Sequence, residues 1–240
     1  MLNTGLLYHF YRDEYHILLY FGCLLGVAIV SYLLGSINSA ILFSRLVYRS
    51  DIRKSGSGNA GMTNMLRTFG KKAALLTLVG DMGKTVLALL IAGLVFGFRY
   101  VGGISIGGPM GECYLAGLFA VLGHVYPIFY KFKGGKGVLV TSTMALVLSP
   151  VPFAMLFIVF VLIVWISKYV SLGSISVAAL YPVAMRGYFA IMGDSVMPAL
   201  TAISTITLAI LIIYCHRANI IRISNRTENK ISFGKKKTDE

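Results

Sequence analysis

Two polar segments of the chain carry residue types that bind phosphate groups. The first segment, residues 55–67, is dense in glycines, hydroxyls and amides and ends in Arg67. Glycines permit positive φ and close backbone approach, so successive N–H groups can converge on phosphate oxygens while an arginine supplies charge. A flexible linker would explain the serines and glycines, but not the ordered asparagines, threonine and arginine. The candidate binding residues of this segment, the first loop, are Ser57, Gly58, Asn59, Thr63, Asn64 and Arg67.

The second segment, residues 123–137, carries Lys133 and Lys136 on either side of Gly134-Gly135. A backbone loop of this kind, the third loop, can wrap an anion while the lysines neutralise it. The helix that follows would add the positive end of its dipole. The alternative is that both lysines only reach from the edge of an apolar run into water. The third loop is therefore a second candidate anion site.

Two histidines, His124 and His216, lie at the ends of apolar runs. An imidazole there can donate to a phosphate or move a proton, although a lone histidine at such a place is more often structural. A metal site would need carboxylates at ligand spacing around them, so we expect no metal. No cysteine or serine has a recognisable base beside it in sequence, which leaves partners in space open.

A third polar pattern, Gly83-Lys84-Thr85, has only the end of a nucleotide-binding P-loop, because the first glycine of that motif would fall at Leu78. Asp81 and Lys84 lie three residues apart on one helical face inside an apolar run, where charge is costly. We expect them to pair for structural reasons rather than for catalysis.

The elements that must position these residues are membrane helices. Of the 240 residues, 57% are hydrophobic and 13% are charged, and the mean hydropathy of +0.78 is atypical of soluble domains. Because lipid offers no partner to free backbone groups, the fold is expected to be an all-α integral membrane helical bundle, one domain over residues 1–240. About seven transmembrane helices are predicted, at residues 17–44, 73–98, 113–130, 138–150, 151–167, 170–186 and 196–215. Pro150 and Pro152 favour a turn between the fourth and the fifth.

The net charge of +13 must gather in the few segments that remain in water. It indicates lipid headgroups or phosphorylated substrates as partners rather than nucleic acid, unless the charge only orients the helices. The first and third loops are both expected in the cytoplasm. With seven spans, residues 1–16 form a short extracytoplasmic N-terminal segment without a cleaved signal peptide, and residues 217–240 form a basic cytoplasmic C-terminal tail.

Together these segments resemble the PlsY family, the bacterial membrane acyl-phosphate:glycerol-3-phosphate acyltransferases, over nearly the whole chain. The blocks that carry the resemblance are Gly35-Ser36-Ile37, residues 57–67 with Gly70-Lys71-Lys72, Gly123-His124 through Gly137, Tyr169-Val170-Ser171-Leu172, His216-Arg217-x-Asn219-Ile220-x-Arg222 and Glu228-Asn229-Lys230. The chain departs from the family pattern at Asn38, Ala40, Met62 and Leu139-Val140, none of which removes a charged or phosphate-binding group.

The resemblance implies an enzyme that moves a fatty acyl group from acyl phosphate to the 1-hydroxyl of glycerol 3-phosphate. Its products would be lysophosphatidate and phosphate, in the first step of phospholipid synthesis. The resemblance implies membrane lipid as a partner but no cofactor, CoA or acyl carrier protein. It also implies a multi-pass protein of the bacterial plasma (inner) membrane, with an active site that faces the cytoplasm.

The same analogy gives the expected site residues. The catalytic set is Arg67, Lys136, His216 and Asn219. The substrate-binding set is Ser57, Gly58, Asn59, Thr63, Asn64, Gly134, Gly135 and Ser171, with Lys133 and His124 as second choices. Because acyl phosphate is already activated, direct attack by the hydroxyl is expected. Arg67 and Lys136 would hold phosphates, and His216 or a substrate phosphate oxygen would take the proton.

Two other classes of function stay open on the sequence. One is a small transporter or channel for a phosphorylated solute, which cationic loops and seven spans would also suit. The other is an inactive lipid-binding relative. Soluble-faced glycerolipid acyltransferases carry His-x-x-x-x-Asp, and no histidine of this chain has an aspartate five positions later.

Overall fold

The structure is a computed structural model that describes residues 17–97, 100–101, 104–105, 110–194 and 196–231. Its elements are α1 (Ile17–Ser36), α2 (Ser39–Leu46), the 3-10 helix η3 (Ile52–Lys54), α3 (Met62–Phe69), α4 (Lys71–Phe96), β1 (Tyr100–Val101), β2 (Ile104–Ser105), α5 (Met110–Val125), the 3-10 helix η4 (Ile128–Tyr130), α6 (Val138–Leu148), α7 (Pro150–Ser167), α8 (Val170–Ile191), α9 (Ala199–Cys215) and α10 (Arg217–Ser224). The predicted outer segment 1–16 and the end of the basic tail, 232–240, lie outside the described residues and stay predictions.

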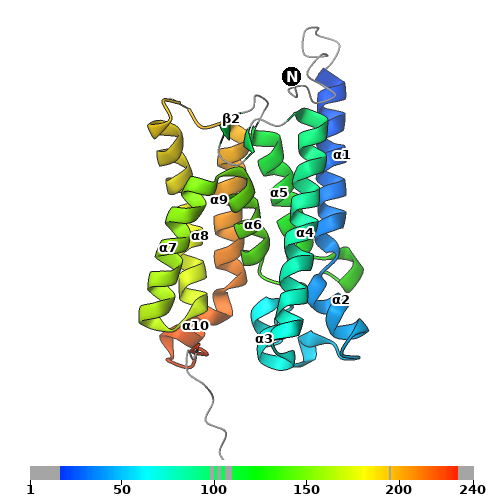
Figure 1. Cartoon of the computed structure of the whole chain (residues 1–240), viewed down its shortest axis with the longest axis vertical. Helices are drawn as coiled ribbons and strands as arrows, with labels where there is room; N and C mark the ends of the chain where they lie inside the picture. The colour runs from blue at the N-terminus through cyan, green and yellow to red at the C-terminus, as the bar shows by residue number, and fades with distance from the viewer. Residues whose placement is uncertain (1–16, 98–99, 102–103, 106–109, 195, 232–240) are drawn as a thin grey trace, which may run out of the picture.

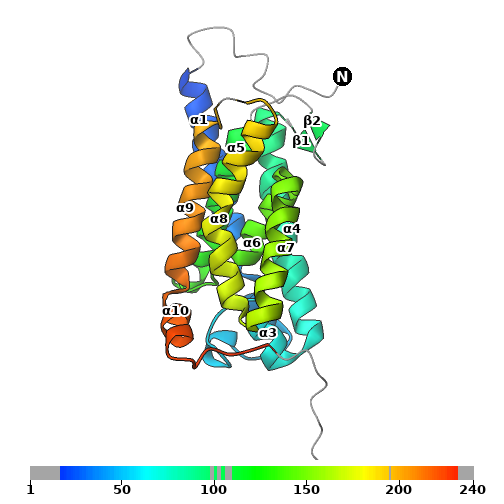
Figure 2. The same cartoon turned by 90° about the vertical axis from the view of Figure 1, so that its left-hand side faces the viewer.

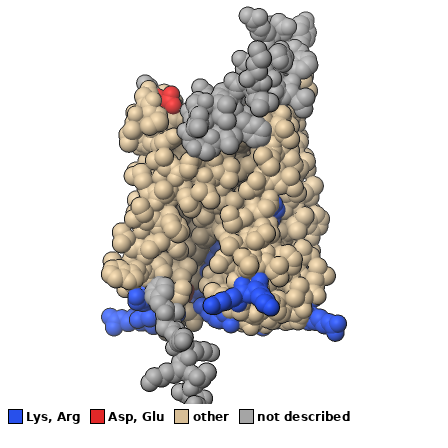
Figure 3. Space-filling model, in the orientation of Figure 1, with Lys and Arg blue, Asp and Glu red and all other residues tan. Residues whose placement is uncertain are grey.

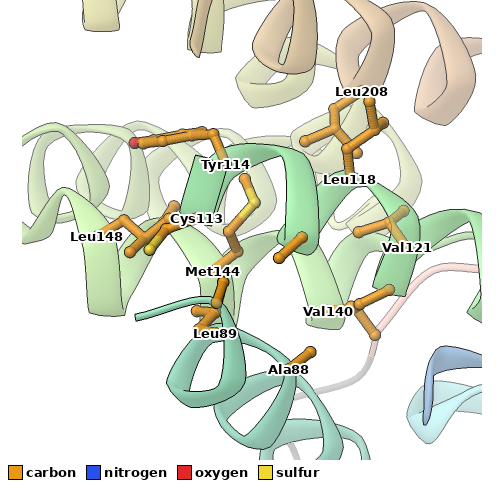
Figure 4. Packing of buried hydrophobic residues seen from close by; sticks show 14 of the residues in the cluster. Ala88, Leu89, Cys113, Tyr114, Leu118, Val121, Val140, Met144, Leu148 and Leu208 are labelled. Carbon is orange, nitrogen blue, oxygen red and sulfur yellow. The ribbon is translucent and has the colours of Figure 1, made fainter. Parts of the chain in front are cut away.

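The long helices run side by side as an all-α membrane bundle, as predicted (Figures 1 and 2). The central helix is α5, which packs on α1, α4, α6 and α9. Helices α7 and α8 pack as a pair, α8 also contacts α9, and α6 contacts α4, α5 and α7. Tyr114 and Val121 of α5, Met144 of α6 and Leu208 of α9 belong to one buried cluster at the centre (Figure 4). In the described part of the chain, the sheet content is the two-residue antiparallel pair of β1 with β2.

The outer faces of these helices are apolar. Exposed large side chains include Phe157 and Trp165 of α7 and Leu87 and Leu90 of α4, a surface suited to hydrocarbon. Among the described residues, five helical segments are long and apolar enough to cross a membrane, and α9 with α10 would make a sixth. The remaining predicted span corresponds to α6, which has 11 residues, whereas a full crossing takes about 20. The count of seven therefore stays a prediction.

Two breaks between helices shape the bundle. The predicted turn lies at Ser149, after which α7 begins with Pro150 in its first turn. The first predicted span, 17–44, is not one continuous helix, because α1 and α2 are separated before and at Asn38. The Asn38 side chain caps α2 by accepting a hydrogen bond of 3.0 Å from the Ile41 N–H. Hydropathy alone missed this break because long apolar stretches continue on both sides of the short polar segment 36–39.

Lysines and arginines gather at one end of the bundle, the end that carries α3 and α10 (Figures 1 and 3). Figure 3 also shows basic atoms recessed in a hollow between the α7–α8 side and the α3–α4 side of the molecule. The first loop and the elbow between α9 and α10 lie at this end (Figure 1). The bundle therefore has one basic end, and the prediction that this end faces the cytoplasm stays open.

Candidate active site

The Asn64 side chain holds the first loop in shape. Its Nδ2 donates to three carbonyl oxygens, those of Ile52, Ser55 and Asn59, at 3.3, 2.9 and 3.0 Å. Its Oδ1 accepts from the Ser57 N–H at 2.9 Å, and Asn64 is only 2% exposed. The first loop is therefore ordered, in contrast to a flexible linker. Because Asn64 uses its amide inside the loop, its predicted contact with substrate stays a prediction.

The outer side of the first loop presents hydroxyls and a guanidinium. Thr63 and Arg67 lie exposed one turn apart on α3, and Ser57 and Gly58 are exposed in the turn before it. Gly56 and Gly58 have φ values of 59° and 72°, which glycine adopts without strain. The tight turn thus leaves the predicted groups Ser57, Thr63 and Arg67 facing outward.

The paired glycines of the third loop pack against the end of α5. The N–H groups of Gly134 and Gly135 donate to the carbonyls of Val125 and His124, each at 3.1 Å. A Cβ on either glycine would overlap atoms of His124. These N–H groups satisfy terminal helix carbonyls, so the charge for an anion at this loop comes from lysines. The place of Gly134 and Gly135 in the substrate site stays a prediction.

Arg53 joins the two loops, although sequence reasoning did not name it as a site residue. Its Nη1 donates to the carbonyl oxygens of Tyr130 at 3.0 Å and Lys133 at 3.2 Å. Asp51 forms an ion pair of 2.7 Å with the Arg53 guanidinium. The hydrogen bond from Arg53 holds the pKa of the Asp51 carboxyl well below its usual range. The available signal was a pair of opposite charges, two residues apart, just before the first loop.

Three predicted residues from distant parts of the chain meet in one network. The Lys136 Nζ donates to Asn219 Oδ1. The Asn219 Nδ2 in turn donates to Glu228 Oε1 at 2.7 Å. Ser171 Oγ donates to the same oxygen at 3.0 Å, and Arg222 Nε lies 2.7 Å from Glu228 Oε2. Glu228 was quoted in the family pattern but not predicted as a site residue, and it connects the start of α8 to α10.

Burial lowers the pKa of two groups at this end. Lys136 is partly buried next to the elbow, and this burial lowers the pKa of its ammonium to about 8. His216, at the end of α9, is 3% exposed, and burial lowers the pKa of its imidazole to about 4. Its Nδ1 lies 2.7 Å from the Ile212 carbonyl, which assigns the proton to Nδ1 and leaves Nε2 as an acceptor. His216 is therefore neutral at physiological pH.

A cavity of about 290 Å³ lies between the third loop and the α9–α10 elbow. Its lining consists of Asn59, Val125, Tyr126, Phe132, Lys133, Gly134, Gly135, Lys136, Tyr214, Cys215 and Arg217. The cavity thus brings Asn59 of the first loop to the lysines of the third loop. The other predicted site residues lie outside this lining, and they are Ser57, Gly58, Thr63, Asn64, Arg67, His124, Ser171, His216 and Asn219.

The fold and this arrangement define a class of protein. It is a membrane protein of several helical spans that gathers lysines, arginines, amides and a neutral histidine beside a cavity at one end of the bundle. A sequence profile of the family described as glycerol-3-phosphate acyltransferase matches residues 25–226. The chain belongs to this family, the PlsY family, as the resemblance predicted.

The sequence of this chain aligns with those of its relatives over most of their length. The chain is 43% identical over 208 residues to glycerol-3-phosphate acyltransferase 2 of Bacillus cereus (strain ZK / E33L), covering 87% of this chain and 95% of that one. It is 37% identical over 231 residues to glycerol-3-phosphate acyltransferase of Chlorobium luteolum (strain DSM 273 / BCRC 81028 / 2530), covering 88% and 98%. These relatives, like the family, are acyltransferases, a class that differs from the transporter left open by the sequence.

Two crystal structures of PlsY (YgiH), an integral membrane glycerol 3-phosphate acyltransferase, share this fold. The glycerol 3-phosphate form has a TM-score of 0.73 at 33% identity and covers 87% of this chain and 96% of its own. The lysophosphatidic acid form has a TM-score of 0.70 at 32% identity and covers 87% and 95%. The chain is thus an integral membrane protein of the acyltransferases of phospholipid synthesis.

Proposed function

We propose that this chain transfers a fatty acyl group from acyl phosphate to the 1-hydroxyl of glycerol 3-phosphate. The hydroxyl oxygen attacks the acyl carbon, the bond from that carbon to the phosphate oxygen breaks, and lysophosphatidate and inorganic phosphate form. Family membership and the glycerol 3-phosphate and lysophosphatidic acid forms of the related PlsY structures support the substrate and product. The observation that carries the proposal is that Lys136, which lines the basic cavity, is held by Asn219 and through Glu228 is linked to Ser171.

Two cations, Lys136 and Arg67, bind the phosphates of the two substrates. Lys136 at the cavity and Arg67 on the exposed face of α3 neutralise the phosphates of the two substrates. Asn219 fixes the Lys136 ammonium, and Glu228 fixes Asn219. Because these side chains are already held in place, they lose less conformational freedom when a substrate binds. Ser57, Asn59 and Thr63 add polar contacts from the first loop.

The chemistry asks little of the protein beyond alignment, because the phosphate of an acyl phosphate is already a good leaving group. His216 presents an unprotonated Nε2 and can accept the hydroxyl proton, or a phosphate oxygen of the substrate can take it. The cations stabilise the negative charge that develops on the carbonyl and the leaving phosphate. No covalent enzyme intermediate is required.

The donor is acyl phosphate rather than acyl-CoA or an acyl carrier protein. A cavity of about 290 Å³ suits a phosphate with a glycerol unit, and the apolar helix faces beside it offer the acyl tail a lipid environment. The concentration of lysines and arginines at this end supports a cytoplasmic orientation. Because the relatives are bacterial, we propose the plasma membrane as the location of this chain.

The test is phosphate release by the purified protein in a lipid phase. Palmitoyl phosphate and glycerol 3-phosphate are supplied together and separately, and palmitoyl-CoA replaces palmitoyl phosphate in a parallel reaction. The proposal predicts release only with palmitoyl phosphate and glycerol 3-phosphate together, and its loss in Arg67→Ala. Acylation of glycerol 3-phosphate by palmitoyl-CoA would contradict the proposed donor. If neither donor gives an acylated product, the proposed acyltransferase activity is wrong.

A further inference from the structure

Three ionisable side chains are buried inside the spans, away from the proposed substrates. Asp81 and Lys84 of α4 and His124 of α5 are 1%, 8% and 3% exposed. Lys84 Nζ lies 2.7 Å from Asp81 Oδ1 and 3.1 Å from His124 Nδ1. The predicted pairing of Asp81 with Lys84 is confirmed, and His124 joins it. Charge at this depth is costly, so the network requires a physical reason.

The break between α1 and α2 supplies part of that reason. Where α1 ends, backbone carbonyls lose their helical partners, and in lipid such groups need another donor. Lys84 Nζ donates to the Gly35 carbonyl at 3.1 Å and to the Ile37 carbonyl at 2.9 Å. A cation also complements the negative end of the α1 dipole. Lys84 therefore secures the point at which the chain leaves α1 toward the first loop.

His124 connects the same network to both loops. His124 Nδ1 lies 3.1 Å from Lys84 Nζ and 3.6 Å from Asp81 Oδ1. Because an ammonium group only donates, the shorter contact assigns Nδ1 as an acceptor and the proton to Nε2. A Cβ on Gly135 would overlap His124 Nε2 and lie 2.7 Å from the Ala60 carbonyl oxygen. Gly135 belongs to the third loop and Ala60 to the first, so both loops meet at this imidazole. The Ala60 carbonyl also accepts from Asn38 Nδ2 at 3.4 Å, at the same helix break.

We propose that the Asp81–Lys84–His124 network is a positioning device that sets the distance between the first and third loops. This inference rests on the proposed function, because the two loops carry Arg67 and Lys136, which would hold the two substrate phosphates. The network acts from inside the membrane, whereas Arg53 ties the same loops at the aqueous side. In this account His124 positions Gly135 and Lys136 and does not touch substrate.

The variant Lys84→Met tests the inference, because it keeps the shape of the side chain and removes its donors. The matched control is Thr85→Val in the next position of α4, since Thr85 is also buried and its hydroxyl donates only to the Asp81 carbonyl of its own helix at 2.6 Å. Spin labels at Leu66→Cys in the first loop and Lys131→Cys in the third loop report the loop separation, in a background whose native cysteines are replaced.

In Lys84→Met we expect a broadened and shifted distance distribution and a fall in kcat/KM on the order of tenfold to a hundredfold. Thr85→Val should match the parent in both. Loop distances and kinetics in Lys84→Met equal to those of Thr85→Val would overturn the inference. If Lys84→Met does not fold, Asp81→Asn, which removes only the charge, replaces it. Changed loop distances and a lower kcat/KM in Asp81→Asn would support the inference, and values equal to those of Thr85→Val would overturn it. Wild-type protein that releases no phosphate, while Lys84→Met still changes the loop distance, would instead refute the proposed function alone.

Discussion

At the scale of single residues, the site depends on how its polar groups are fixed. The family resemblance predicted Lys136, Ser171 and Asn219, and the structure brings them together through Glu228. The family pattern contained Glu228, but its role in the site could not be predicted, because a carboxylate in a basic tail has no visible partner until the chain folds. The different roles of the two histidines also become visible only in the structure. His216 offers a free Nε2, whereas the Nδ1 of His124 faces Lys84.

The charge of Lys136 should limit activity at alkaline pH. Burial lowers its pKa to about 8, so the ammonium loses its proton as pH rises through this value and its attraction for phosphate weakens. The KM for a phosphorylated substrate should therefore rise above about pH 8. Lys136→Arg, whose guanidinium stays charged, should move this rise to higher pH. A pH profile of kcat/KM for both proteins checks this, and an identical alkaline limb in both would contradict it.

His216 should act on turnover rather than on binding. Its neutral imidazole can accept a proton, so His216→Ala should lower kcat by roughly 10²- to 10⁴-fold with little change in KM. Because burial lowers its pKa to about 4, protonation should reduce the wild-type rate only as pH falls toward that value. Steady-state kinetics measure both effects. Nearly unchanged kcat in His216→Ala would assign the proton to the substrate phosphate instead.

At the scale of elements, breaks and close crossings place the loops. The turn before α7 was predicted because Pro150 cannot continue a helix. The break between α1 and α2 was missed because the few polar residues near Asn38 do not end the apolar run, and the role of Asn38 as a cap depends on three-dimensional contacts. The end of α8 was also placed too early, at 186, although the helix continues to Ile191.

The crossing of α1 with α5 should be sensitive to one methyl group. A Cβ on Gly123 would overlap backbone atoms of α1, so Gly123→Ala should destabilise the protein by ~1–3 kcal/mol. Gly83 on α4 has open space around the equivalent position, so Gly83→Ala should be neutral or stabilising by about 0.5–1 kcal/mol. Thermal unfolding in detergent compares them. Equal unfolding midpoints for the two variants would show that α1 and α5 can move apart without loss of stability.

At the scale of the whole molecule, composition was enough to predict the membrane class. The 57% hydrophobic content reappears as exposed apolar helix faces. The number of spans was harder to predict, because α6 is apolar but has only 11 residues. Hydropathy gives the length of an apolar run, but not whether its helix crosses the bilayer or ends inside the bundle.

The charge asymmetry of the molecule predicts its orientation. Two single-cysteine variants test this, Lys131→Cys in the third loop and Val196→Cys in the α8–α9 connection, which lies at the opposite end of the bundle (Figure 1). A membrane-impermeant reagent added to intact cells should label position 196, and it should reach position 131 only after permeabilisation. Labelling of position 131 from outside would place the basic end, and with it the proposed site, outside the cytoplasm.

The central claim is acyl transfer with phosphate as the leaving group, and product stoichiometry tests it most directly. The purified protein is given palmitoyl phosphate and isotope-labelled glycerol 3-phosphate, and both products are quantified by mass spectrometry. We predict one lysophosphatidate, acylated at the 1-hydroxyl, for each phosphate released. Phosphate released without labelled lysophosphatidate would show hydrolysis rather than transfer, and would contradict the account.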